Sequence, residues 1–345
     1  MTEAKTQPKL NIEKTVQDIL NTIERERERE IIARRYGLFD RKETLEQIGE
    51  LLGITRERVR QLEKAVIARL KAMAHEDLPH IKEVEQVLTE KIQELGHVAR
   101  ISDLTAQLAE EANKLDQARV SFLAQLVPSL AFVDESDHFH MSAGIAAKHS
   151  EKAIRDQVGH VIETIKKIGV PAKIEEIAGA LGNPDANHTK ALASISKHLA
   201  TLNGRYGLTK WPMVNPKNIR DKIYVILHEN GKQMHFNDIA GAIRDSGFKR
   251  KEVTTQAIHN ELIKDARFVL VGRGIYALKE WGYKKGTVAD VITEVLKEAK
   301  TSLHRDEIVR RVLKKRFVKE TTILLNLQGK QEFKRVAKAT YALAV

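Results

Sequence analysis

The fold of the N-terminal part of this chain is decided by the stretch Gly53-Ile54-Thr55-Arg56-Glu57-Arg58-Val59-Arg60-Gln61-Leu62-Glu63. Glycine is the residue type that ends helices in a left-handed conformation, and a threonine two residues later can cap a new helix. We expect that helix over residues 56–71. Upstream, Thr44-Leu45-Glu46-Gln47 fits a capping box, which starts a helix that ends at Gly53.

Two helices joined by a glycine-containing turn form a helix-turn-helix, whose second helix enters the major groove of DNA by its N-terminal residues. Arginine suits guanine, glutamine suits adenine, and glutamate can accept a hydrogen bond from cytosine. The predicted base contacts are therefore Arg56, Glu57, Arg60 and Gln61. The charge pattern alone fits an ordinary solvated helix face equally well.

The longer string, from Arg25 to Leu38 and then from Thr44 to Leu70, closely resembles region 4 of the sigma-70 family of sigma factors. The resemblance covers roughly residues 14–72. In that family the domain reads the promoter −35 element and docks on the flap of the RNA polymerase β subunit. The resemblance therefore implies the same base contacts, and phosphate contacts from Thr44, Leu45, Thr55 and Arg58.

The chain departs from that family in one respect. A complete sigma factor has an upstream region that melts the −10 element with exposed aromatic side chains. Few residues precede the resemblance here, and aromatic residues make up 5% of the chain. We therefore expect duplex recognition without self-sufficient promoter opening.

Behind residue 75 one plan recurs about every 65 residues, which is typical of tandem modules. Each copy has three helical runs and two short strands, which is the winged-helix plan. The third helical runs are expected at 117–125, 189–202, 252–264 and 319–327, and the last strands at 139–141, 206–208, 275–278 and 340–343. The fold class is therefore mainly α, a helix-turn-helix domain followed by a tandem array of winged-helix modules.

The predicted domains differ in charge. The chain has a net charge of +11, but residues 76–150 carry −7 and residues 284–345 carry +8. A basic surface favours a polyanionic partner such as double-stranded DNA. The boundaries are a disordered tail over 1–13, a region 4-like domain over 14–75, an acidic module over 76–150, further modules over 151–216 and 217–283, and a basic module over 284–345.

Residues 217–283 resemble the HARE-type winged helix, which also forms the N-terminal domain of the RNA polymerase delta subunit. The resemblance rests on Met234–Ile239 and on the run from Asp265 to Trp281. Cations at the start of a third helix, at a wing tip or along a basic helix suit phosphate contact without base reading. The predicted phosphate contacts are Lys249, Arg250, Lys251, Arg273, Arg310, Arg311, Lys314 and Lys315, and a solvated basic face is the alternative.

Several kinds of chemistry are not expected. The chain has no cysteine, which fits a reducing bacterial cytoplasm. It has no phosphate-binding loop, no dinucleotide-binding glycine pattern and no membrane-length apolar run. His138 and His140, with Asp134 and Asp137, fall in a predicted wing and offer too few ligands on one face for a metal site. We expect no cofactor, no metal and no enzymatic activity.

These observations favour a transcription regulator that recognises a −35-like element and contacts RNA polymerase. An architectural, nucleoid-type protein that coats DNA with little sequence preference is the first alternative. A polymerase accessory subunit that uses the region 4-like domain for protein docking is the second. The ratio of specific to non-specific affinity distinguishes these classes.

Overall fold

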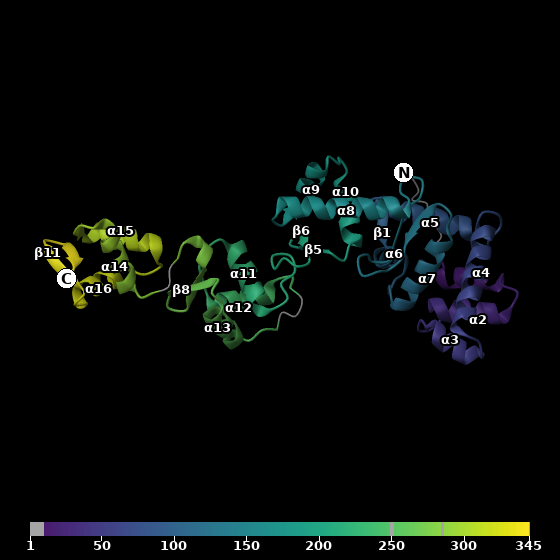
Figure 1. The fold of residues 1–345 in the computed structure, drawn as a ribbon, viewed down its shortest axis with the longest axis horizontal. Coiled ribbons are helices and arrows are strands. Elements are labelled where there is room, and N and C mark those ends of the chain that lie inside the picture. Colours follow the sequence, from purple (N-terminus) through teal and green to yellow (C-terminus); the bar gives the residue numbers. More distant parts are fainter. Residues whose placement is uncertain (1–9, 249–251, 284–285, 345) are drawn as a thin grey trace, which may run out of the picture. The chain divides into compact units, whose positions relative to one another are not determined.

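The structure is a computed structural model that describes residues 10–248, 252–283 and 286–344. The chain divides into two compact units, Met1–Lys210 and Trp211–Val345. Helices dominate both units, and small antiparallel sheets follow each repeated group of helices (Figure 1). The structure thus has the winged-helix modules that the periodicity predicts.

The first unit begins with four helices. They are α1 (Ile12–Asn21), α2 (Glu26–Tyr36), α3 (Leu45–Leu52) and α4 (Arg56–Ala74). Helix α1 starts inside the predicted N-terminal tail because the Asn11 side chain accepts a hydrogen bond from the amide of Lys14, and Ile12 is buried. The structured part of the chain therefore begins earlier than the predicted boundary at residue 14.

Two winged helices complete the first unit. The first consists of α5 (Ile81–Glu94), β1 (Val98–Arg100), α6 (Ile101–Leu108), α7 (Lys114–Leu126), β2 (Leu130–Val133) and β3 (Ser142–Ile145). The second consists of α8 (Glu151–Ile168), β4 (Ala172–Lys173), α9 (Ile174–Leu181), α10 (Ala186–Ile195), β5 (Leu199–Leu202) and β6 (Arg205–Leu208). Each sheet has three antiparallel strands with the last strand in the middle, in the orders β1-β3-β2 and β4-β6-β5.

The second unit also holds two winged helices. One consists of α11 (Ile219–Asn230), β7 (Met234–His235), α12 (Phe236–Asp245), α13 (Thr255–Lys264), β8 (Phe268–Gly272), β9 (Ile275–Leu278) and a 3-10 turn, η1 (Lys279–Trp281). The other consists of α14 (Val288–Ala299), β10 (Leu303–His304), α15 (Arg305–Lys315), α16 (Glu320–Gly329), β11 (Phe333–Ala337) and β12 (Thr340–Leu343). Their sheets have the orders β7-β9-β8 and β10-β12-β11.

Two predicted elements are wrong, and both errors have one cause. The helix expected over 189–202 ends at Ile195, and the strand expected over 139–141 lies instead at Ser142–Ile145. The amide of His140 donates to the carbonyl of Ile195 at 2.8 Å, and the amide of Lys197 donates to the carbonyl of His138 at 2.9 Å. These hydrogen bonds join the two winged helices and take both segments out of their expected elements.

One apolar core joins α1, α2 and α4 to the first winged helix. It includes Val16 of α1, Leu70 of α4, Leu88 of α5 and Phe122 of α7, all almost fully buried. Helix α7 packs against α1, α2 and α4 (Figure 1). Because burial of apolar surface is the main favourable term in folding, these elements stabilise one another as a single structural body.

Candidate nucleic-acid interface

The helix-turn-helix is formed by α3 and α4, with local signals at each end. The Thr44 hydroxyl accepts from the amide of Gln47 at 3.3 Å, and the Gln47 side chain accepts from the amide of Thr44 at 2.9 Å. Gly53 ends α3 with φ of 64°. The Thr55 hydroxyl then caps α4 by accepting from the amide of Arg58 at 3.2 Å. The capping box and the turn match the sequence prediction.

A small core of its own fixes the angle between these two helices. Ile31, Ile48 and Val59 form it and are fully buried. Gly49, on α3, allows the backbone of the turn before α4 to pack closely against α3. A Cβ added at Gly49 would meet the carbonyl oxygen of Ile54 at 2.6 Å. Sequence reasoning missed Gly49, although a glycine inside a helical pattern is a signal of close backbone approach.

The N-terminal half of α4 presents a continuous polar face. All four predicted base-contacting residues, Arg56, Glu57, Arg60 and Gln61, are exposed, while Val59 between them points into the core. Lys64 is exposed on the same helix, four residues after Arg60, and sequence reasoning did not include it. Residues three and four apart share one helix face, so the spacing from Arg60 could have predicted that Lys64 lies on the same face.

Two of these side chains are bonded to each other. The Arg60 guanidinium donates to both carboxylate oxygens of Glu57, with Nε–Oε2 at 2.9 Å and Nη2–Oε1 at 2.7 Å. The hydrogen bond from Arg60 holds the pKa of the Glu57 carboxyl below its ordinary value. Both side chains remain more than half exposed, at 55% for Arg60 and 54% for Glu57. Glu57 therefore holds the Arg60 guanidinium in place while leaving it open to a ligand.

The predicted phosphate contacts of this domain lie at the starts of α3 and α4. Thr44 and Thr55 are the capping residues, Leu45 begins α3, and Arg58 is exposed in the first turn of α4. The first amides of a helix have no partner within the helix and carry a partial positive charge, which favours an anion. The threonine hydroxyls accept from the backbone, so each still has its proton to donate to a phosphate oxygen.

Helix α7 covers the side of α1, α2 and α4 that carries their shared apolar core. The phenol of Tyr36 donates to the Gln125 side chain at 2.8 Å, and its ring meets Phe122 edge-on at 5.2 Å between centroids. Buried Arg119 donates to the carbonyl of Leu38 at 2.9 Å. Every residue of α7 except Lys114 is buried or half-buried. This third helix is therefore not available for a DNA groove.

The third helix of the second winged helix is covered as well. In α10, only Asn187 and Lys190 are exposed. The ring of His188 hydrogen-bonds to the carbonyl of Gly96 at 2.7 Å, and the Asn187 side chain donates to the carbonyl of Glu94 at 3.2 Å. Helix α10 packs on β1 of the first winged helix. Within the described part of the first unit, α4 is thus the helix-turn-helix recognition helix with a free basic face.

The predicted phosphate contacts of the second unit have different surroundings. Lys249, Arg250 and Lys251 lie outside the described residues. Arg273 is exposed in the turn between β8 and β9. Its neighbour Gly274 has φ of 70°, and a Cβ there would meet the His235 ring at 2.5 Å, so this tight turn requires glycine.

Helix α15 carries the other four predicted contacts. Arg310 and Arg311 both pair with Glu307 at 2.6 Å, and these two hydrogen bonds lower the pKa of the Glu307 carboxyl to about 2. Lys315 pairs with Glu298 at 2.7 Å and with Glu294 at 3.5 Å. Lys314 is exposed and makes no ion pair with any residue that the structure describes. The sequence prediction did not include these acidic partners.

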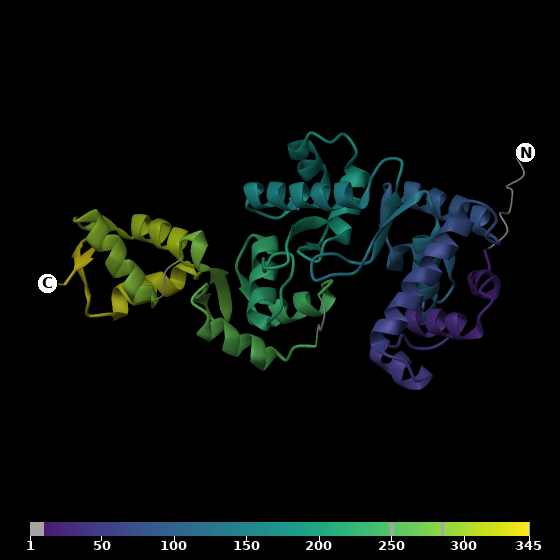
Figure 2. The same ribbon diagram turned by 45° about the vertical axis from the view of Figure 1, so that its right-hand side comes forward.

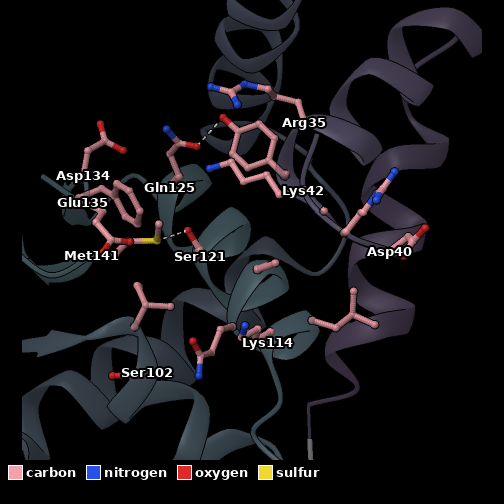
Figure 3. A pocket seen from close by; sticks show the side chains of 18 of the residues that line it. Arg35, Asp40, Lys42, Ser102, Lys114, Ser121, Gln125, Asp134, Glu135 and Met141 are labelled. Atoms are coloured by element: carbon pink, nitrogen blue, oxygen red, sulfur yellow. Dashed lines mark hydrogen bonds between the residues drawn. The ribbon is translucent and has the colours of Figure 1, made fainter. Parts of the chain in front are cut away.

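A cleft of about 1180 Å³ lies between the loop before α3 and the elements α6 and α7 (Figure 3). Its lining includes Lys42 and Lys114 together with Asp134 and Glu135, so charges of both signs line it. The Ser121 hydroxyl donates to the sulfur of Met141 at 2.8 Å. A mixed lining of this kind gives the cleft no net preference for a phosphate.

His138 of the predicted wing faces the second winged helix, whereas His140 lines the cleft. The His138 and His198 rings are in hydrogen-bond contact, with Nδ1 and Nε2 at 2.7 Å. No group of three or more histidine, aspartate or glutamate side chains in the described residues has an arrangement that could hold a metal ion. Across the same residues, no helix combines the length and apolarity needed to cross a membrane.

Comparison with known proteins assigns the N-terminal module. Residues 25–72 match the family described as Sigma-70, region 4. The chain is 39% identical over 61 residues to the RNA polymerase sigma factor SigA of Bacillus sp, and 51% identical over 47 residues to the RNA polymerase principal sigma factor HrdD of Streptomyces griseus. These alignments cover 17% and 13% of this chain, and only 16% and 14% of the two relatives.

Residues 25–72 therefore form a sigma-70 region 4 domain, a helix-turn-helix of a DNA-binding type. The matched segment begins at Arg25 and ends within α4, so α1 lies before it. The matches to these sigma factors lie in a short N-terminal stretch of the chain.

Proposed function

We propose that this protein is a sequence-specific, non-enzymatic DNA-binding transcription regulator of bacterial cells that recognises a −35-like element through α4. Arg56, Glu57, Arg60 and Gln61 are the base-reading side chains. The observation that carries the proposal is the free polar face of α4, combined with the burial of α7 and α10, the third helices of the next two modules. Base reading by the first unit is thereby concentrated on one helix.

In this proposal the second unit adds non-specific contacts with the duplex that flanks the element recognised by α4. In this proposal residues 217–283 are a HARE-type winged helix, and the last module adds basic side chains that contact phosphates. Phosphate contacts position a protein on the duplex without reading its sequence. They would raise affinity for promoter and non-promoter DNA alike, so discrimination stays with α4.

Contact with RNA polymerase is the second part of the proposal. The apolar face that α1, α2 and α4 share is covered by α7, whose Phe122 and Leu123 are fully buried there. A polymerase surface would therefore have to engage exposed residues of the region 4 domain or another module. This covered face also argues against the accessory-subunit alternative, in which the domain serves mainly for protein docking.

The architectural alternative predicts an array of equivalent DNA-binding modules. The first and second winged helices do not fit that picture, because their third helices are used for contacts within the chain. The acidic character of residues 76–150 also disfavours contact with phosphates. We therefore place the first two winged helices as a scaffold for the reading helix.

Selection of random duplexes by the purified full chain, alone and with core RNA polymerase, tests the proposal. We expect a recovered motif related to a −35 element. Replacing Arg60 by alanine should weaken binding by about 5- to 150-fold at one base position, which is the discrimination that a bidentate arginine provides.

Lys71→Ala is the matched control, because Lys71 is exposed in the last turn of α4, away from the reading residues. It should leave the recovered motif unchanged. Tight binding with no motif would favour the architectural protein. A uniform loss across all sequences in Arg60→Ala would contradict base reading by this residue.

A further inference from the structure

Among the described helices and hairpins of the last module, the β11–β12 hairpin is the one that carries cations and no acidic residue. Between Phe333 and Leu343 the sequence contains Lys334, Arg335 and Lys338 and no acidic residue. All three side chains are exposed, and none makes an ion pair with a described residue. Phe333 and Tyr341 are buried in the module core and fix the hairpin to it. Figure 2 shows the hairpin, in yellow, beside the end marked C.

Helix α15 of the same module contrasts with the hairpin. Arg310, Arg311 and Lys315 are bound to three carboxylates, those of Glu307, Glu294 and Glu298. Three cations and three carboxylates sum to zero charge, whereas the hairpin retains three positive charges. A phosphate that approaches Arg310, Arg311 or Lys315 competes with a carboxylate already bound there, which leaves α15 with Lys314 as its exposed cation without an ion pair to a described residue. A phosphate that approaches the hairpin displaces only mobile counterions.

The third helix, α16, carries no basic residue between Glu320 and Gly329. Its exposed side chains include Thr321, Gln328 and Leu325, and the last is 69% exposed. A third helix usually carries the groove contacts of a helix-turn-helix fold. Without cations and with a protruding leucine, α16 is poorly suited to lie along phosphates.

We propose that the last winged helix binds duplex DNA through its hairpin, with Lys334, Arg335 and Lys338 on the phosphates, and not through α15 or α16. This inference rests on the proposed DNA-binding function and specifies the surface that serves it. The contact is sequence-independent, because lysine and arginine on a short hairpin neutralise phosphates without a pairing code for bases.

Salt dependence of binding to a non-specific duplex tests this surface in the full chain. Each phosphate neutralised contributes about 0.9 to the slope of log K against log salt concentration. The variant Lys334→Gln, Arg335→Gln, Lys338→Gln should therefore lower the slope by about 2 to 3. The matched variant Arg310→Gln, Arg311→Gln, Lys315→Gln removes the same formal charge and should lower it by less than about 1.

A charge-conserving variant, Lys334→Arg with Lys338→Arg, should keep the wild-type slope and excludes a mere loss of fold. If the α15 variant loses the slope and the hairpin variant does not, the hairpin assignment is overturned while DNA binding stands. If wild-type protein binds no duplex at any salt concentration, the proposed function itself fails, and this inference with it.

Discussion

Replacing Phe122 by alanine should destabilise the region 4 domain, although Phe122 lies outside it in sequence. The side chain is fully buried on α7 and meets the ring of Tyr36, on α2, at 5.2 Å. Deleting a buried phenylalanine side chain costs about 3–5 kcal/mol, from lost burial and from the cavity that remains. For a unit of this size, that loss corresponds to a fall in Tm of about 6–20 °C.

Hydrogen exchange followed by mass spectrometry on the full chain is the suitable assay, because it reports the first unit separately from the second. Amides of α4 near Val66 and Leu70, which are buried in the shared core, should exchange about 100- to 5000-fold faster in Phe122→Ala if they open with the whole unit. Amides of α14 in the second unit should be unaffected.

Phe39→Ala is the matched control. Phe39 lies at the edge of the same contact, with the Arg119 guanidinium 5.8 Å from its ring centroid, but it is 41% exposed. Its loss should cost about 1 kcal/mol or less. If exchange in α4 is unchanged in Phe122→Ala, while α5 and α7 are destabilised, the two modules do not share a cooperative core and the reasoning is refuted.

Two further predictions concern titrating side chains. Burial, followed by the charges of His188, His97 and Lys148, lowers the pKa of His149, and its ring stacks on that of His188 at 4.7 Å. Because the unfolded chain then binds a proton more readily, the stability that His149 contributes is fully present above about pH 7. It is lost as the pH falls below about 6.5, toward the lower pKa of His149 in the folded protein. The variant His149→Phe keeps an aromatic ring against His188 but has no group that titrates in this range. It should flatten the dependence of Tm on pH between about 7 and 5. If that dependence is unaltered, His149 is not the group that causes it. Glu57→Gln removes the carboxylate that holds Arg60, so we expect tighter binding to non-specific duplex and a lower ratio of specific to non-specific affinity, measured by competition. An unchanged ratio would show that Glu57 does not position Arg60 for reading.

The helix-turn-helix could be predicted from sequence because its determinants are local. The capping box at Thr44 and Gln47, the left-handed Gly53 and the cap at Thr55 act within a few residues of one another. Sequence spacing alone places Arg56 and Arg60 on the exposed face of the second helix. The repeated winged-helix plan was equally readable, since its helical periodicity lies within each module.

The features that sequence did not predict depend on long-range contacts. The end of α10 at Ile195 is set by hydrogen bonds from the segment around His140 in another module. The neutralisation of Lys315 requires Glu294 and Glu298 of a different helix to lie opposite it. The cover that α7 provides over α1 and α4 follows from packing between elements far apart in the chain. Hydrophobic periodicity shows which face of a helix is apolar, but it does not show which other element packs against that face.

The shared core also fixes the order in which the DNA-reading domain can be completed during synthesis. The ribosome releases α1 to α4 before α7, but Val16, Ile19 and Leu20 pack in the same core as residues of α7. Until α7 has emerged, the apolar side of the nascent domain has no covering partner within its own chain. The recognition helix α4 is therefore made before α7, and its supporting core is closed only once the first winged helix has been translated.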